Sequence, residues 1–162
     1  MYTPLANLPG SSKVWVYQAS EVFDNLTAKT IEEKAKVFVE QWTAHDQELK
    51  AGVEVLNNLF LVIAVDEGYN GASGCSVDKK VRFIQSLESQ LNLHFFDRMR
   101  IAWKSGAGIR IAPFNMFGKL LQKGEVGDDT VVYNNLVADL EEFRSSWEVP
   151  FIKSWHRNLI SA

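Results

Sequence analysis

The chain has 162 residues, of which 46% are hydrophobic and 23% are charged, and its net charge is −3. This length is enough for one domain with a buried core, so we expect a single domain over residues 1–162. An acidic chain does not suit a protein that neutralises phosphates, so we expect no nucleic-acid partner. The longest fully apolar run, residues 59–65, is far below the roughly 20 residues of a membrane helix, so we expect no membrane partner.

The first twelve residues, MYTPLANLPGSS, have no basic start and no long apolar segment, so no signal peptide is predicted. The single cysteine, Cys75, rules out an internal disulfide and a zinc site of several cysteines. We therefore expect a soluble, cytoplasmic protein without a cofactor. An unknown small ligand and a homo-oligomer are both compatible with the sequence.

In chain order, residues 13–18 (KVWVYQ) come first and predict a buried strand, because they are β-branched or aromatic on both faces. The next segment predicts a helix over residues 27–43, with Thr27 or Thr30 as its N-cap. Its apolar positions recur at helical spacing: Ile31, Ala35, Phe38 and Trp42.

Residues 50–56 alternate between apolar and polar and predict a strand with one exposed face. Asn57 and Asn58 suit a tight hairpin turn. The run 59–65 (LFLVIAV) is apolar on both faces, which predicts a central strand.

A second amphipathic helix is predicted after the loop 66–76, from apolar residues at helical spacing: Val77, Val81, Ile84, Leu87 and Leu91. Residues 95–104 alternate and predict a half-exposed strand, and a glycine-rich turn leads to another strand at 109–114. The C-terminal third predicts a helix at 115–123, a strand at 129–136, a helix at 140–147 and a tail, 149–160, that packs on the domain.

The first hundred residues thus follow the order β-α-β-β-α-β, which predicts an α+β fold with a ferredoxin-like βαββαβ core, a two-layer sandwich over residues 13–104. Residues 105–162 would extend this core with further strands and helices. Because the first and third predicted strands are apolar on both faces, the second face of the sheet must also be covered, by the C-terminal third or by another subunit.

The predicted topology places the end of the first helix and the end of the third strand at the same edge of the sheet. We therefore expect these side chains to converge there: His45, Asp66, Glu67, Cys75 and Asp78. Ser73 or Ser76 is the expected N-cap of the second helix. Cys75 then lies at its N-terminus, where free N–H groups and the helix dipole stabilise a thiolate or a bound anion.

Four interpretations of this edge stay open. Cys75 is a nucleophile with His45 as base and Asp66 or Glu67 orienting the imidazole; or His45, Cys75 and carboxylates bind zinc or iron; or the edge holds a small ligand without chemistry; or Cys75 is structural. The candidate ligand-binding residues are Glu67, Gly71, Ser73, Gly74, Ser76 and Asp78. The glycines would allow close approach of a ligand to the backbone.

Three other features are weaker candidates. Phe96, Arg98 and Arg100 share a strand face, which is more typical of a solvated face than of an RNA-binding surface. His156 could reach a site only if the tail folds back. An exposed cluster of Trp147 and Trp155 would indicate a protein-interaction surface.

Several segments resemble an uncharacterised bacterial family of soluble proteins of about 160 residues: WTAHDQELKA (42–51), VDEGYNGASGCSVDKKVRFI (65–84), FFDR (95–98), DTVVYNNLV (129–137) and WEVPFIKSWH (147–156). The resemblance implies a shared fold and a cytoplasmic location, and it carries over no catalytic residues. Members sometimes have the label "ABC transporter ATPase". This chain lacks the G-x-x-x-x-G-K-[ST] phosphate loop that such an activity needs.

The sequence therefore favours a cytoplasmic binding or accessory protein with a small-ligand or anion site near Cys75. Whether it is an enzyme stays open. The alternatives are a thiol-dependent enzyme with Cys75 and His45, and a protein-interaction module that uses the C-terminal tryptophans.

Overall fold

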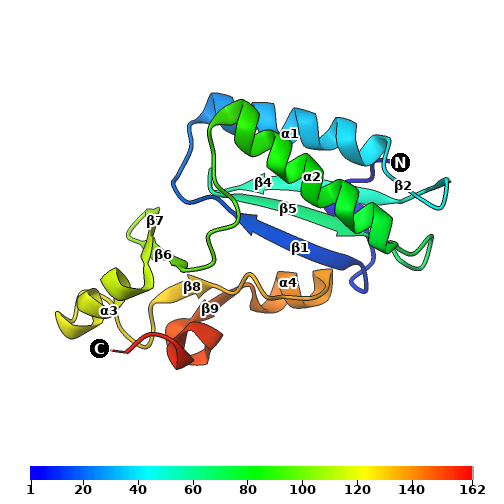
Figure 1. Ribbon diagram of the computed structural model, residues 1–162. Coiled ribbons are helices and arrows are strands. Elements are labelled where there is room, and N and C mark those ends of the chain that lie inside the picture. Colours follow the sequence, from blue (N-terminus) through cyan, green and yellow to red (C-terminus); the bar gives the residue numbers. More distant parts are fainter. Residues whose placement is uncertain (162) are drawn as a thin grey trace.

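The computed structural model describes residues 1–161 and consists of two antiparallel sheets, a short hairpin and the helices that cover them (Figure 1). The elements in chain order are β1 (Lys13–Gln18), α1 (Asn25–Glu40), β2 (Thr43–Ala44), β3 (Gln47–Glu48), β4 (Ala51–Leu56), β5 (Phe60–Val65), α2 (Gly74–Leu91), β6 (Arg100–Ser105), β7 (Gly108–Pro113), α3 (Phe114–Gln122), β8 (Val131–Tyr133), α4 (Leu140–Ser146) and β9 (Glu148–Pro150). Three short 3-10 helices lie at Leu5–Asn7, Phe151–Lys153 and Trp155–Asn158.

The first sheet has the order β1-β5-β4, with β5 antiparallel to both neighbours. The helices α1 and α2 lie together over one face of this sheet (Figure 1). Asn57 and Asn58 join β4 to β5 with φ angles of 55° and 51°. These left-handed values are those a two-residue hairpin turn requires, and asparagine tolerates them well.

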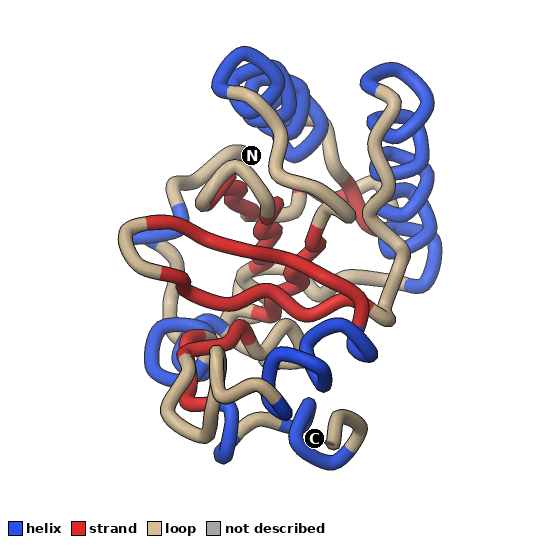
Figure 2. Tube along the Cα trace, turned by 90° about the vertical axis from the view of Figure 1, so that its left-hand side faces the viewer, coloured by secondary structure: helices blue, strands red, loops and turns tan. Residues whose placement is uncertain are grey.

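The second sheet has the order β7-β6-β8-β9 and lies on the other side of the first sheet (Figure 1). Phe60 of β5 packs against Tyr133 and Trp147, with ring centroids 5.0 and 4.9 Å apart. Figure 2 shows the two long helices at one end of the view, the C-terminal segment at the other and the strands between them. The C-terminal third therefore covers the second face, which is one of the two alternatives that the sequence left open.

The α+β class is confirmed, but the ferredoxin-like βαββαβ topology is not. The first three strands and two helices follow the expected order, whereas β6, expected as the fourth strand of the same sheet, belongs to the second sheet. The strand begins at Arg100 rather than at residue 95. Three consecutive residues of β6 are buried: Ile101, Ala102 and Trp103. Both faces of this strand are therefore covered, whereas the alternating sequence predicts a half-exposed strand. As a result, β1 is an edge strand.

The ends of both long helices are set by local polar contacts. The N-cap of α1 is Asp24 rather than Thr27 or Thr30: the Asp24 carboxylate accepts a hydrogen bond from the Thr27 backbone N–H (2.7 Å). The N-cap of α2 is Ser73, as expected, and Ser76 reciprocates the hydrogen bond. The hairpin of β2 and β3 after α1 was not predicted.

The tail packs on the domain, as predicted. Phe151 and Ile160 are buried, while Leu159 is exposed. They join a second hydrophobic core between α3 and the second sheet, which also contains Ile101, Trp103, Phe117 and Val132. The strand predicted at 129–136 is shorter, since β8 spans only Val131–Tyr133.

Candidate functional site

The segments that the sequence placed around Cys75 lie side by side. Trp42, which follows α1, donates from its indole Nε1 to the Ser76 carbonyl at 2.9 Å. The Asn70 side chain donates to the Glu48 carbonyl at 2.7 Å. The β2–β3 hairpin, the loop after β5 and the first turn of α2 thus share one edge of the molecule.

The candidate catalytic side chains at this edge do not form a hydrogen-bonded set. Cys75 is exposed in the first turn of α2, and His45 is exposed at the tip of the hairpin, where its φ is 51°. Asp66 lies 3.8 Å from Lys50 and accepts a hydrogen bond from the Gly68 N–H. Within residues 1–161, no interaction links Cys75, His45 and Asp66, and no three His, Cys, Asp or Glu side chains gather as a metal site.

The candidate ligand-binding residues there do not enclose a cavity either. Ser73 and Ser76 use their hydroxyls on each other's backbone N–H, which already satisfies part of the helix N-terminus. A side chain at Gly71 or Gly74 would meet no neighbour within 4 Å. In the described range, five surface cavities are lined by residues other than the predicted set, Glu67, Gly71, Ser73, Gly74, Ser76 and Asp78.

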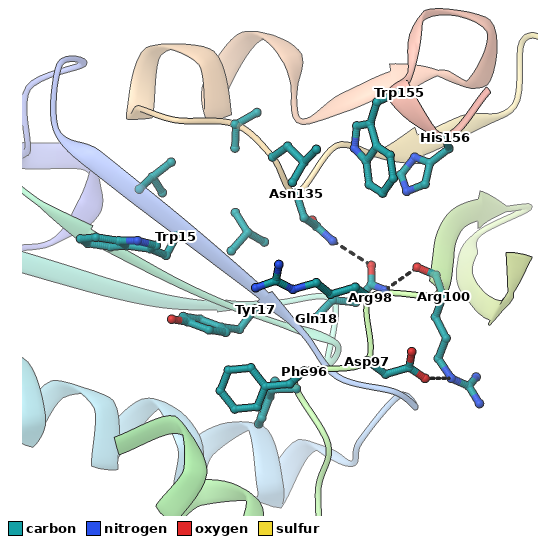
Figure 3. A pocket seen from close by; sticks show the side chains of 15 residues that line it. Trp15, Tyr17, Gln18, Phe96, Asp97, Arg98, Arg100, Asn135, Trp155 and His156 are labelled. Atoms are coloured by element: carbon teal, nitrogen blue, oxygen red, sulfur yellow. Dashed lines mark hydrogen bonds and ion pairs between the residues drawn. The ribbon is translucent and has the colours of Figure 1, made fainter. Parts of the chain in front are cut away.

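A cavity of about 330 Å³ instead follows the free edge of β1 (Figure 3). It is formed by residues 14–18 of β1, residues 95–98 with Arg100, residues 135–137, and the pair Trp155 and His156. We call it the β1 groove. Its position is the one that a fourth strand would occupy in the predicted ferredoxin-like sheet, because β6 leaves that edge for the second sheet.

One lip of the β1 groove is aromatic and lies on the helix side of the first sheet. Tyr17 and Phe96 meet edge to face, with centroids 6.0 Å apart. Burial raises the pKa of Tyr17 to about 12, although the nearby Arg98 guanidinium opposes this shift. Arg98 is exposed, extends beside Tyr17 (Figure 3), and has no acidic partner among residues 1–161. This lip therefore offers aromatic surface and one free cation.

The opposite lip is formed by the C-terminal third. The rings of Trp155 and His156 stack with centroids 3.9 Å apart, and His156 Nδ1 lies 2.6 Å from the Ser154 hydroxyl. Burial lowers the pKa of His156 to about 4, so the ring is neutral at pH 7. Leu136 and Val137 continue this lip with aliphatic surface.

Amide hydrogen bonds close one end of the β1 groove (Figure 3). The Gln18 side chain donates to the Arg100 carbonyl at 3.2 Å and accepts from the Asn135 side chain at 3.0 Å. Asn135 in turn accepts from the Trp147 indole N–H at 3.0 Å. This chain of contacts joins β1, β6 and the segment after β8, so the groove is a built feature of the fold rather than a gap between loose loops.

A buried lysine lies behind the aromatic lip. Lys80, on the inner face of α2, is 2% exposed, and its Nζ sits 3.7 Å from the centroid of the Trp15 ring and 5.2 Å from that of Tyr17. Lys13 approaches the same indole at 5.2 Å. Burial, helped by the charge of Lys13, lowers the pKa of Lys80 to about 7. Over residues 1–161, neither lysine has a carboxylate within ion-pair distance.

Some of these residues have a partial signal in the sequence. The buried positions of α2 recur at helical spacing: Ser76, Lys80, Ile84 and Leu87. The apolar pattern correctly predicts Ile84 and Leu87 on this face, but it also includes Val77 and Val81 in place of Ser76 and Lys80. Arg98 was assigned to a solvated face, and the tail was expected to bring His156 to a site only if it folded back, as it does. Trp147 is buried, so it offers no exposed aromatic surface to a partner.

No protein-family model, no curated protein and no solved structure matches the chain significantly. The resemblance to a bacterial family therefore stays a prediction based on the motifs quoted above. Across the part of the chain that the structure describes, every helix is too short or too polar to cross a membrane. Function has to be argued from the site itself.

Proposed function

We propose that this protein binds a ligand without transforming it, and that the β1 groove is the binding site. The observation that carries the proposal is a cavity of about 330 Å³ with apolar lips and one unpaired guanidinium, that of Arg98. Cavities of roughly 300 Å³ and above, mostly apolar with few polar groups, are typical of small-ligand sites. The sequence also favoured a small-ligand or anion site, although it placed that site near Cys75.

The lips define the chemistry of the ligand. Trp15, Tyr17 and Phe96 favour an apolar or aromatic body, because flat rings stack and bury large areas. Arg98 favours a carboxylate or another planar anion, with which a guanidinium forms two parallel hydrogen bonds. The cations behind Trp15 add positive potential on the same side. The ligand should thus combine an apolar body with at least one anionic group.

The titratable groups of the groove support binding rather than catalysis. Tyr17 is protonated at pH 7, and burial moves its pKa still further from neutrality, to about 12. His156 is neutral and its Nδ1 is engaged by Ser154, so it acts in packing. The groove lining contains no cysteine, serine or threonine that could serve as a nucleophile.

A titration followed by NMR tests the proposal. The probes are 3-phenylpropionate and indole-3-acetate, each with its neutral primary amide as a matched control. The five tryptophans give the readout: the indole N–H signals of Trp15 and Trp155 should shift, whereas those of Trp42, Trp103 and Trp147 should not. The acids should bind more tightly than the amides.

Two variants refine this test. Arg98→Gln should weaken binding of the acids about tenfold and leave the amides unaffected, because it removes only the charge-assisted hydrogen bonds. Arg82→Gln, on the exposed face of α2, is the matched control and should change nothing. Shifts centred on Cys75 and His45, or no shift with any probe, would contradict the proposal.

A further inference from the structure

The backbone of β1 has an unpaired stretch that faces the β1 groove. The backbone N–H and C=O groups of the odd-numbered β1 residues point toward β5. The same pattern continues beyond the strand, where the Ala19 N–H donates to the Leu59 carbonyl. The even-numbered residues face the free edge. Within residues 1–161, the backbone N–H and C=O groups of Val16 and Gln18 have no hydrogen-bond partner there.

This free stretch is bounded at both ends by the chain itself. The Val14 N–H donates to the Ala138 carbonyl at 3.1 Å, and the Ser20 N–H donates to the His94 carbonyl at 2.9 Å. The span between them is roughly 20 Å at about 3.3 Å per residue. It is long enough for a short extended segment. The edge strand of a second folded copy would collide with the two flanking segments.

The two sides of the free edge differ in charge. Side chains of a strand added here would alternate between the helix side and the second-sheet side of the groove. On the helix side, Lys13 and Arg98 are exposed cations without an acidic partner among residues 1–161, whereas Lys80 is buried against the Trp15 ring. The other side presents apolar groups: Val16, Leu136, Val137 and Trp155.

We propose that the β1 groove takes an extended peptide segment in which acidic and apolar residues alternate, and that this segment adds to the first sheet as a short strand. Its backbone pairs with Val16 and Gln18, its acidic side chains face Lys13 and Arg98, and its apolar side chains face the C-terminal third. Main-chain pairing then supplies affinity, and the alternating side chains supply specificity. The inference rests on the proposed function, since it names the ligand class of the same groove.

The test uses the capped pentapeptide acetyl-Val-Glu-Val-Glu-Val-amide and its lysine counterpart, acetyl-Val-Lys-Val-Lys-Val-amide. The glutamate peptide should shift the backbone amide signals of Val16 and Gln18 and bind at least tenfold more tightly than the lysine peptide. The backbone N–H groups of alternate peptide residues should point toward β1. N-methylation of a residue whose N–H faces β1 should abolish binding, whereas N-methylation of its neighbours should be tolerated. Equal effects at all positions would overturn strand addition.

Charge reversal sharpens the test. Arg98→Glu should remove most of the preference for the glutamate peptide, because it replaces a cation with an anion, while Arg82→Glu should leave the preference unchanged. If neither pentapeptide binds but the aromatic acids still shift Trp15 and Trp155, the peptide inference fails and the proposed function stands. If neither pentapeptides nor acids affect the groove, both fail. A dimer in which Val16 and Gln18 become protected without any peptide would overturn the inference in favour of a second copy.

Discussion

The two edges of the first sheet are treated differently by the chain. At the β4 edge, the N-terminal segment lies alongside the strand: the Ala51 N–H donates to the Met1 carbonyl at 3.1 Å, and the Thr3 N–H donates to the Ala51 carbonyl at 2.8 Å. At the β1 edge, only the two ends are paired, and Val16 and Gln18 face a cavity. Within residues 1–161, Val53 and Val55 of β4 have no backbone partner on the outer side either, so the two edges differ mainly in what their free stretches face.

This difference bears on function because an unpaired strand edge is a hazard that proteins normally cover. The N-terminal segment covers the β4 edge at Ala51. The β1 edge is recessed behind residues 95–98 and 135–137, so it is shielded from another folded sheet yet accessible to a narrow ligand. An edge left open inside a groove is better explained by binding than by incomplete folding.

The largest effect is expected from displacing the N-terminal segment from the β4 edge. A side chain at Gly52 would place its Cβ 2.3 Å from the Thr3 carbonyl oxygen and 2.9 Å from the Leu5 side chain. Gly52→Val should therefore displace the N-terminal segment and lower the free energy of unfolding by about 3–4 kcal/mol. Urea unfolding measures the loss, and hydrogen exchange should show that the Ala51 amide loses its protection.

Gly71→Ala is the matched control for that variant, since nothing lies within 4 Å of a Cβ there. It should change stability by no more than about 0.5 kcal/mol. If Gly52→Val were equally harmless, residues 1–3 would not be a stable part of the β4 edge, and the contrast between the two edges would disappear.

The next largest effect concerns Lys80, whose charge has no acidic partner within residues 1–161, and the pH dependence of stability that follows from it. The native pKa of Lys80 is lowered to about 7, whereas the unfolded chain titrates near the ordinary value of about 10.4. Between these values the unfolded state binds more protons, so the free energy of unfolding should rise as the pH increases from 7 to 10. The rise attributable to Lys80 should be about 2–3 kcal/mol, since the contact of the ammonium with Trp15 offsets part of the burial cost.

Lys80→Met isolates this contribution because it keeps the length of the side chain and removes its charge. The variant should be more stable than the wild type at pH 7 and below, and its pH dependence between 7 and 10 should be correspondingly flatter. Lys79→Met, at an exposed neighbouring position, is the control. An unchanged slope in Lys80→Met would mean that the ammonium is not the group responsible.

A smaller effect is expected from His156 on the far lip of the groove. Its native pKa is about 4, against about 6.5 in the unfolded chain, so the unfolded state binds more protons as the pH falls from 6.5 to 4. The wild type should lose about 1–2 kcal/mol of stability in this window relative to His156→Phe, which keeps a ring against Trp155 but does not titrate. Parallel curves for the two proteins would contradict the buried, neutral state of the imidazole.

The sequence was sufficient for those parts of the fold that depend on local periodicity. The positions of the first sheet's strands and of both long helices follow from the local spacing of apolar residues, and the asparagine turn and the Ser73 cap are contacts between residues close in the chain. The destination of β6 was not predictable in this way, because an alternating strand fits either sheet and the choice depends on what covers Ile101 and Trp103.

The β1 groove was missed for a related reason. It is assembled from four segments that are not adjacent in the chain, and each of them looks ordinary alone: aromatic residues of a buried strand, arginines of a solvated face, the residues after a short strand, and a tail. Only the move of β6 to the second sheet leaves the β1 edge open. The site near Cys75, in contrast, could be proposed from the sequence, because local patterns define the order of the helices and strands that surround it.

The smallest effects are expected from variants of Cys75 and His45, which test whether the functional site lies in the β1 groove or near Cys75. Cys75 is exposed, so iodoacetamide should alkylate it without denaturant. Cys75→Ser should change stability by no more than about 0.5 kcal/mol and leave binding of the glutamate pentapeptide unchanged, since no described contact links Cys75 to the β1 groove. His45→Ala should leave the alkylation rate unaltered at every pH. A rate that falls in this variant would instead indicate a thiolate stabilised by His45, and a loss of peptide binding in Cys75→Ser would move the functional site from the open edge of β1 to the N-terminus of α2.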